Sequence, residues 1–138
     1  MVEKPLILVV DDEPFYTDVL ENLLQNEYRL IIARSGEEAL EMVQTGPTPD
    51  LVLLDVLLPG IDGYEVCQRL QSDEKMRRTP IIFLTVKSNV DDEVRGFNLG
   101  AVDYISKPMS PPIVLARVRT HIKLVRTKRQ LDNLLRNQ

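Results

Sequence analysis

Charged and hydroxyl side chains follow the apolar runs of this chain at the points where those runs end. These side chains are Asp11, Asp12, Asp55, Thr85 and Lys107. The first two stand next to Glu13, so three carboxylates follow one another directly. Each carboxylate makes the ionisation of its neighbours less favourable, so the group needs a compensating cation or the positive end of a helix. Cation binding and helix capping are therefore the two chemistries open to it.

Five short apolar runs must position these side chains. They are "LILVV" at 6–10, "YRLIIA" at 28–33, "DLVLLD" at 50–55, "PIIFLT" at 80–85 and "AVDYIS" at 101–106. Such runs, apolar on both faces, are typical of parallel strands that are covered on both sides. Amphipathic segments separate them, and their strict alternation predicts a single α/β domain with right-handed crossovers.

The amphipathic segments carry recognisable helix starts. The predicted starts are Pro14 after a capping Glu13, the capping boxes Ser35–Glu38 and Asp62–Glu65, Ser88, and "SPP" at 110–112. Ligands of an open α/β sheet bind beyond the carboxyl ends of the strands, where the strand order reverses. If the five strands lie in the order 2-1-3-4-5 across the sheet, the acids, the hydroxyl and the ammonium would converge on one rim. Taken singly, each could be a cap, a turn residue, a strand end or a solvated cation.

In its motifs and their spacing the chain resembles a bacterial response-regulator receiver domain, the phosphoacceptor of two-component signalling. The matching pieces are "VDDEP", "LLDVLLPGIDGYEV", "LT" at 84–85 and "GAVDYISKP" at 100–108. The resemblance covers residues 5 to about 120. It implies a flavodoxin-like fold, in which a doubly wound five-stranded parallel sheet of order 2-1-3-4-5 is followed by an extended C-terminal helix.

The resemblance also implies a role for individual residues. Asp55 would be the phosphoacceptor, and Lys107 and Thr85 would contact the phosphoryl oxygens. The residues that would hold Mg²⁺ are Asp11, Asp12, Asp55 and, through its backbone carbonyl, Leu57. Thr85 and Tyr104 would form the switch that alters the surface of the fourth helix, fifth strand and fifth helix. Such a protein is not an enzyme in the usual sense, because it catalyses only its own phosphorylation and dephosphorylation.

Two departures from the family pattern stand beside the expected site. Val86 follows Thr85 where the family has a small residue, and Leu57 is apolar where others are polar. Both would slow phosphoryl exchange. Leu57 also argues against an acyl-phosphate hydrolase, which would need an acid there, and "DDEP" is unlike the glycine-rich phosphate loop of a nucleotide or flavin binder. A stand-alone or degenerate receiver that acts as a protein-interaction module remains the alternative.

Composition and charge bear on location and partners. Residues 1–112 carry a net charge of −10 and residues 113–138 a net charge of +6. The basic segment contains no aromatic residue for base stacking, which favours a solvated helix face over a nucleic-acid contact. No apolar run is long enough to cross a bilayer, and the single cysteine, Cys67, suits a reducing compartment. We expect a cytoplasmic protein with a histidine kinase or phosphotransfer protein as partner.

The last segment of the chain predicts a long helix with two apolar stripes. One stripe, Leu115, Val118, Ile122 and Val125, should face the sheet. The second, Leu124, Thr127, Leu131 and Leu134, points nearly the opposite way and would be covered by a second copy, giving a homodimer. His121, the only histidine, is expected to be a surface or interface residue away from the rim. We divide the chain into a receiver at 1–123 and a helical extension at 124–138, directed towards a dimer seam or an absent output domain for cyclic dinucleotide synthesis or breakdown.

Overall fold

The computed structural model describes residues 3–86 and 90–137. The strands are β1 (Leu6–Val10), β2 (Arg29–Ala33), β3 (Leu51–Asp55), β4 (Ile81–Thr85) and β5 (Asp103–Ser106). The helices are α1 (Pro14–Leu24), α2 (Gly36–Thr45), α3 (Gly63–Ser72), the 3₁₀ turn η1 (Glu74–Met76), α4 (Val90–Asn98) and α5 (Pro111–Arg136). The predicted alternation of strands and helices is confirmed.

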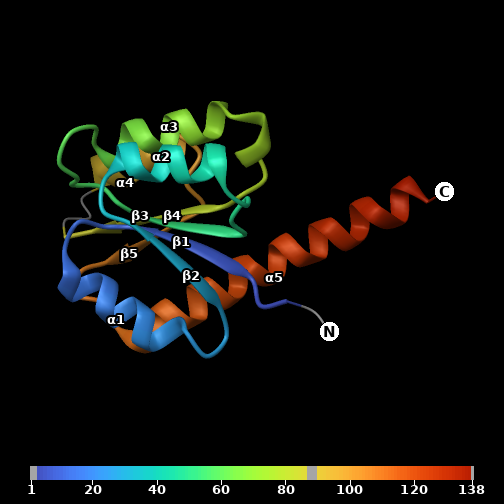
Figure 1. Cartoon of the computed structure of the whole chain (residues 1–138), viewed down its shortest axis with the longest axis horizontal. Coiled ribbons are helices and arrows are strands. Elements are labelled where there is room, and N and C mark those ends of the chain that lie inside the picture. The colour runs from blue at the N-terminus through green and yellow to red at the C-terminus, as the bar shows by residue number, and fades with distance from the viewer. Residues whose placement is uncertain (1–2, 87–89, 138) are drawn as a thin grey trace.

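The strands form one parallel sheet of order β2-β1-β3-β4-β5. Helices α1 and α5 cover one face of the sheet, and α2, α3 and α4 cover the other (Figure 1). This is the predicted doubly wound fold. The order places β1 and β3 side by side at its centre, where the direction of winding reverses.

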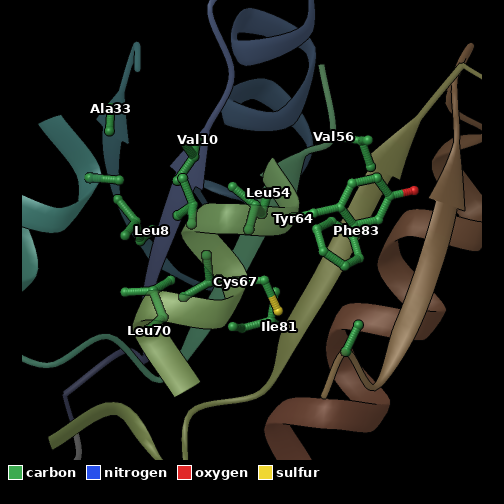
Figure 2. Close-up of a cluster of buried hydrophobic side chains, with 14 of the residues drawn as sticks. Leu8, Val10, Ala33, Leu54, Val56, Tyr64, Cys67, Leu70, Ile81 and Phe83 are labelled. Carbon is green, nitrogen blue, oxygen red and sulfur yellow. The ribbon is translucent and has the colours of Figure 1, made fainter. Parts of the chain in front are cut away.

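Alternate residues of the central strands serve the two faces of the sheet. Ile7 and Leu53 pack with Val118 of α5 on one face, whereas Leu8 and Leu54 belong to the cluster on the other. In that second cluster α3 contributes Tyr64, Cys67 and Leu70, which lie over the strand side chains (Figure 2). Burying one such aliphatic side chain contributes about 1.5–3 kcal/mol, so both faces hold the strand ends firmly in place.

Cys67 is one of these core residues. Its side chain is fully buried, and its sulfur lies 3.6 Å from the carbonyl oxygen of Leu99. Burial raises the pKa of its thiol to about 11. The interpretation of this cysteine as a small buried hydrophobe is therefore confirmed.

The predicted helix starts hold in part. The Ser35 hydroxyl accepts a hydrogen bond from the Glu38 N–H, and the Asp62 carboxylate accepts one from the Glu65 N–H, so Ser35 and Asp62 are confirmed as N-caps. Glu13 stands at the N-cap of α1, but its side chain makes no capping bond, so the capping prediction is wrong in that respect. A Pro at the first helical position leaves one donor fewer to satisfy there. The predicted start at Ser88 lies outside the described residues.

Four strands begin one or two residues after the apolar runs start: β3 begins at 51 rather than 50 and β4 at 81 rather than 80. The starts of β2 and β5 are set by the helix that precedes each of them. β2 begins at 29 rather than 28, because the Tyr28 N–H still donates to the Leu24 carbonyl at the end of α1. β5 begins at 103 rather than 101, because the Ala101 N–H donates to the Gly96 carbonyl of α4. For β2 and β5, the first residue of the apolar run therefore hydrogen-bonds to the end of the preceding helix instead of pairing in the sheet.

Helix α5 is an unbroken helix of 26 residues whose C-terminal part projects beyond the body of the domain (Figure 1). Val118 and Ile122 are buried against the sheet, whereas Leu124, Leu131 and Leu134 are exposed, as the two predicted stripes require. In the described part of the chain, no helix is long and apolar enough to cross a membrane.

Ion pairs fasten α5 to the rest of the domain. Arg129 contacts Asp50 at 2.6 Å, and Arg78 and Asp132 form a second pair at the same end of the sheet. His121, expected at the surface or in an interface, has a largely buried side chain that lies 3.0 Å from the Asp103 carboxylate. That pairing needs β5 and α5 to be adjacent, which the local sequence does not reveal.

Candidate functional site

The sheet register assembles the rim at the carboxyl ends of the strands. Asp55 ends β3 opposite Leu84, and Thr85 ends β4 opposite Ser106 of β5. Backbone bonds continue past the strand ends, since the Val56 N–H donates to the Leu84 carbonyl and the Lys107 N–H to the Thr85 carbonyl. The side chains that follow the strands are therefore fixed relative to one another by the sheet itself.

Three charged groups meet at the centre of this rim with almost no access to water. The Lys107 ammonium lies 2.8 Å from an Asp11 carboxylate oxygen and 3.2 Å from Asp55 Oδ2. The side chains of Lys107 and Asp11 are fully buried, and that of Asp55 is 2% exposed. The contact with Asp55 is a hydrogen bond, whereas the contact with Asp11 is an ion pair without hydrogen-bond geometry. One buried cation thus faces two buried carboxylates.

The remaining acids complete the cluster from the solvent side. Carboxylate oxygens of Asp11, Asp12, Glu13 and Asp55 all lie within 4.8 Å of one another, and the middle two residues are exposed. The Glu13 N–H donates to Asp11 Oδ1 at 3.0 Å. This bond fixes the turn between β1 and α1. Glu13, for which the sequence left capping and cation binding open, therefore stands among the clustered carboxylates.

The pKa shifts follow from this crowding. Burial and then the neighbouring Asp11 charge raise the pKa of Asp55 to about 6, although Lys107 acts in the opposite direction. Burial alone would lower the pKa of Lys107, but its contacts with Asp11 and Asp55 outweigh that effect and raise it. Two carboxylates compete for one ammonium, so the cluster has a net negative charge that favours a further cation.

The donor set fits Mg²⁺. Among the residues that the structure describes, Asp11 Oδ2 is the buried side-chain oxygen left without a hydrogen bond. Mg²⁺ prefers hard oxygen ligands and keeps several waters, which matches two buried and two exposed carboxylates at a solvent-facing rim. Leu57 stands two residues after Asp55, and its N–H donates to Asp55 Oδ1 at 3.2 Å.

The loop after β3 depends on a glycine. A Cβ atom at Gly63, the first residue of α3, would lie 2.2 Å from the Asp55 carbonyl oxygen. The Gly63 N–H donates to the Val56 carbonyl at 2.9 Å. Only a residue without a side chain lets α3 begin so close to the backbone of Asp55.

Three apolar side chains close in sequence to the site residues are exposed. Leu57 is 69% exposed, Val86 is 57% exposed and Phe15 of α1 is 68% exposed. The two departures noted in the sequence therefore lie on the surface beside the buried charges. Exposed apolar side chains of this size offer contact area to a larger partner.

Tyr104, the predicted switch aromatic, points into the domain. Its ring is buried between Phe83 and Phe97, with ring centroids 5.6 and 5.3 Å away. Its hydroxyl donates to the Asp92 carbonyl of α4 at 2.7 Å. A Cβ atom at Gly96 would lie 1.7 Å from that hydroxyl, so this helical glycine makes room for the ring. Thr85 is also buried, and the peptide bond between Lys107 and Pro108 is cis.

One member of the site was missed by the sequence analysis. The ring of Tyr16, in the first turn of α1, lies 4.1 Å from the Lys107 ammonium, measured to the ring centroid. An aromatic residue in an amphipathic helix is usually a packing residue, so its type and position gave no signal. Its place three residues after Glu13 puts it in the first turn of the helix that follows the acids, which does not by itself indicate a contact with Lys107.

Comparison with known proteins places this geometry in a family. The family model described as the response regulator receiver domain matches residues 7–119. A probable cyclic di-GMP phosphodiesterase of Vibrio cholerae is 46% identical over 127 residues, which are 92% of this chain and 29% of that protein. The alkaline phosphatase synthesis transcriptional regulatory protein PhoP of Bacillus subtilis is 47% identical over 118 residues, 85% of this chain and 48% of that protein. The chain thus spans less than half of either relative.

Solved structures agree with this placement. A response regulator from Chloroflexus aurantiacus is 36% identical and superposes with a TM-score of 0.83, covering 88% of this chain and 99% of that one. The signal receiver domain of an HD domain-containing protein from Pseudomonas fluorescens is 27% identical, with a TM-score of 0.84 over 94% and 96% of the two chains.

Proposed function

Because this chain belongs to the response-regulator receiver family of two-component systems, we propose that it accepts a phosphoryl group on Asp55 from a histidine kinase or phosphotransfer protein. The observation that carries the proposal is the buried contact of Asp55 with Lys107. The same ammonium also contacts Asp11, and the exposed acids Asp12 and Glu13 complete the cluster. A carboxylate at the end of a central strand, with exposed acids beside it on the solvent side, suits a nucleophile.

The proposed transfer is a displacement at phosphorus. An oxygen of Asp55 forms a bond to phosphorus as the phosphorus–nitrogen bond of a phosphohistidine breaks, and the imidazole leaves with the electron pair. The Lys107 ammonium, which lies 3.2 Å from Asp55 Oδ2, then pairs with a phosphoryl oxygen, and the Thr85 hydroxyl donates to another. Mg²⁺ held by Asp11, Asp12, Asp55 and the Leu57 carbonyl would neutralise charge on the phosphoryl group.

The proposed output begins with Thr85 and Tyr104. Phosphorylation adds a charge of about −1.5 to −2 and strong acceptors beside Thr85. Movement of Thr85 towards them would change the packing of Tyr104 against α4 and so the surface formed by α4, β5 and α5. The close fit between Tyr104 and Gly96 supports this, since a ring held so tightly cannot move without moving the helix.

The long α5 helix supports a proposal on organisation. We divide the chain into a receiver at 1–123 and an extension at 124–138 that leads to an output domain for cyclic dinucleotide turnover. The cyclic di-GMP relative, which is far longer than this chain, favours this over a stand-alone receiver that acts by protein contacts. We also propose that the exposed leucines of the extension pair with a second copy, and that the protein works in the cytoplasm. Sedimentation of the whole chain and of a chain ending at Lys123 tests the pairing: equal monomer fractions would exclude this seam.

The proposed phosphorylation is tested by intact mass spectrometry after incubation with acetyl phosphate. With Mg²⁺ the chain should gain the mass of one phosphoryl group, and Asp55→Asn should gain none. Asp12→Ala should weaken Mg²⁺ binding and labelling together. Labelling that proceeds equally well in EDTA would contradict the role of the acidic cluster.

A further inference from the structure

The Lys107 ammonium has three close neighbours rather than two. Besides the Asp11 and Asp55 carboxylates, it faces the ring of Tyr16 at 4.1 Å from the centroid. The lysine side chain is fully buried, so these neighbours replace its water shell. The tyrosine is half-buried and belongs to the first turn of α1.

An aromatic face suits this third place for a physical reason. The ring attracts a cation through its quadrupole, and the attraction grows when water is excluded. A third carboxylate would also hold the ammonium, but it would add negative charge where a phosphoryl group must approach. The ring restrains the cation without adding charge and without competing for its hydrogen bonds.

The local structure fixes the ring in this position. Pro14 opens α1, and the Tyr16 N–H donates to the Glu13 carbonyl at 3.1 Å. The neighbouring ring of Phe15 packs edge-on against Tyr16, with centroids 5.2 Å apart and an interplanar angle of 82°. Because the Glu13 N–H is bonded to Asp11, the turn that carries the acids also orients the aromatic pair.

We propose that Tyr16 is a positioning residue for phosphoryl transfer, which holds the Lys107 ammonium at the rim when its carboxylate partners are engaged elsewhere. The inference rests on the proposed function of Asp55. Phosphorylation converts Asp55 from a partner of Lys107 into the carrier of the phosphoryl group. A cation bound only by carboxylates would lose its place as they change partners, whereas the ring contact remains through the transfer.

The test compares Tyr16→Leu with Tyr16→Phe, which is the matched control because it keeps the ring face and removes only the hydroxyl. The first readout is the NMR shift of the Lys107 ε-methylene protons, which a ring face moves upfield. We expect this upfield shift in the wild type and in Tyr16→Phe, and its loss in Tyr16→Leu.

The second readout is the rate of labelling by saturating acetyl phosphate with Mg²⁺. Tyr16→Leu should be slower by roughly five- to thirty-fold, as loss of a desolvated cation–π contact implies, with unchanged Mg²⁺ affinity. Tyr16→Phe should label like the wild type. A Phe variant as slow as the Leu variant, or a Leu variant as fast as the wild type, would overturn the inference.

The two proposals fail in different ways. A wild-type chain that takes up no phosphate would overturn the function proposed for Asp55. A wild-type Lys107 signal at its unperturbed position would overturn the role of Tyr16, and this measurement needs no variant to fold.

Discussion

The two edges of the sheet hold charges in opposite ways. At the carboxyl edge, Lys107, Asp11 and Asp55 are buried together, and the two carboxylates share one ammonium. At the amino edge, Arg129 meets Asp50 with more than half of the arginine side chain exposed. Burying a charge costs free energy that a hydrophobic side chain would not, so the carboxyl-edge cluster is explained by function rather than by stability. The arginines of the amino-edge pairs are largely exposed, so these pairs stabilise the position of the helix only weakly.

Strand β3 connects the two edges. Asp50 precedes it and accepts a hydrogen bond from the Leu6 N–H at 2.7 Å, while Asp55 ends it. The same short strand therefore carries the proposed phosphoacceptor at one end and an anchor of the projecting α5 helix at the other. The comparison predicts large, metal-sensitive effects at the first end and small, salt-sensitive effects at the second.

The largest effect on stability should come from removing the buried cation. Lys107→Met leaves two buried carboxylates without a partner, so the free energy of unfolding of the metal-free protein should fall by about 3–5 kcal/mol. Urea denaturation in EDTA measures this. Lys128→Met, at an exposed lysine of α5, is the control and should stay within about 0.5 kcal/mol of the wild type. A loss at 107 no larger than the control would mean that the buried pairing is not formed.

A smaller effect should follow pH. The raised pKa of Asp55, about 6 against an ordinary 3.8, means that the folded protein keeps a proton that the unfolded chain releases. Stability from this group is complete below the ordinary value and is lost as pH rises through 6. The shift corresponds to at most about 3 kcal/mol, and solvent screening at the rim reduces this to on the order of 1–2 kcal/mol. In EDTA, the wild type should lose stability relative to Asp55→Asn across this range; a constant difference would contradict the shift.

The smallest effect should lie at the amino edge. Arg129→Ala removes an exposed ion pair, so the free energy of unfolding should fall by less than about 1 kcal/mol, and the difference should shrink at high salt. Arg136→Ala, at an exposed arginine for which the described residues offer no ion pair, provides the baseline. An effect as large as that of Lys107→Met would remove the distinction between the two edges.

The sequence predicted this molecule well where its information is local. Runs such as "LILVV" and "LVLLD" identified the strands, and the residues that follow them identified the rim. The strand order came from the family resemblance, because a buried strand's sequence does not say which strand lies beside it. Tyr16 was missed because its role depends on the side of α1 that faces Lys107, and the contacts of His121 and Asp50 depend on where α5 crosses the sheet.

Mapping the phosphate is the most direct test of the central claim. Borohydride reduces an aspartyl phosphate to homoserine, which peptide mass spectrometry locates within the chain. After acetyl phosphate and Mg²⁺, the account predicts homoserine at position 55 and none at Asp11 or Asp12. Homoserine at either of those acids, or none in a protein that binds Mg²⁺ and is folded, would contradict it.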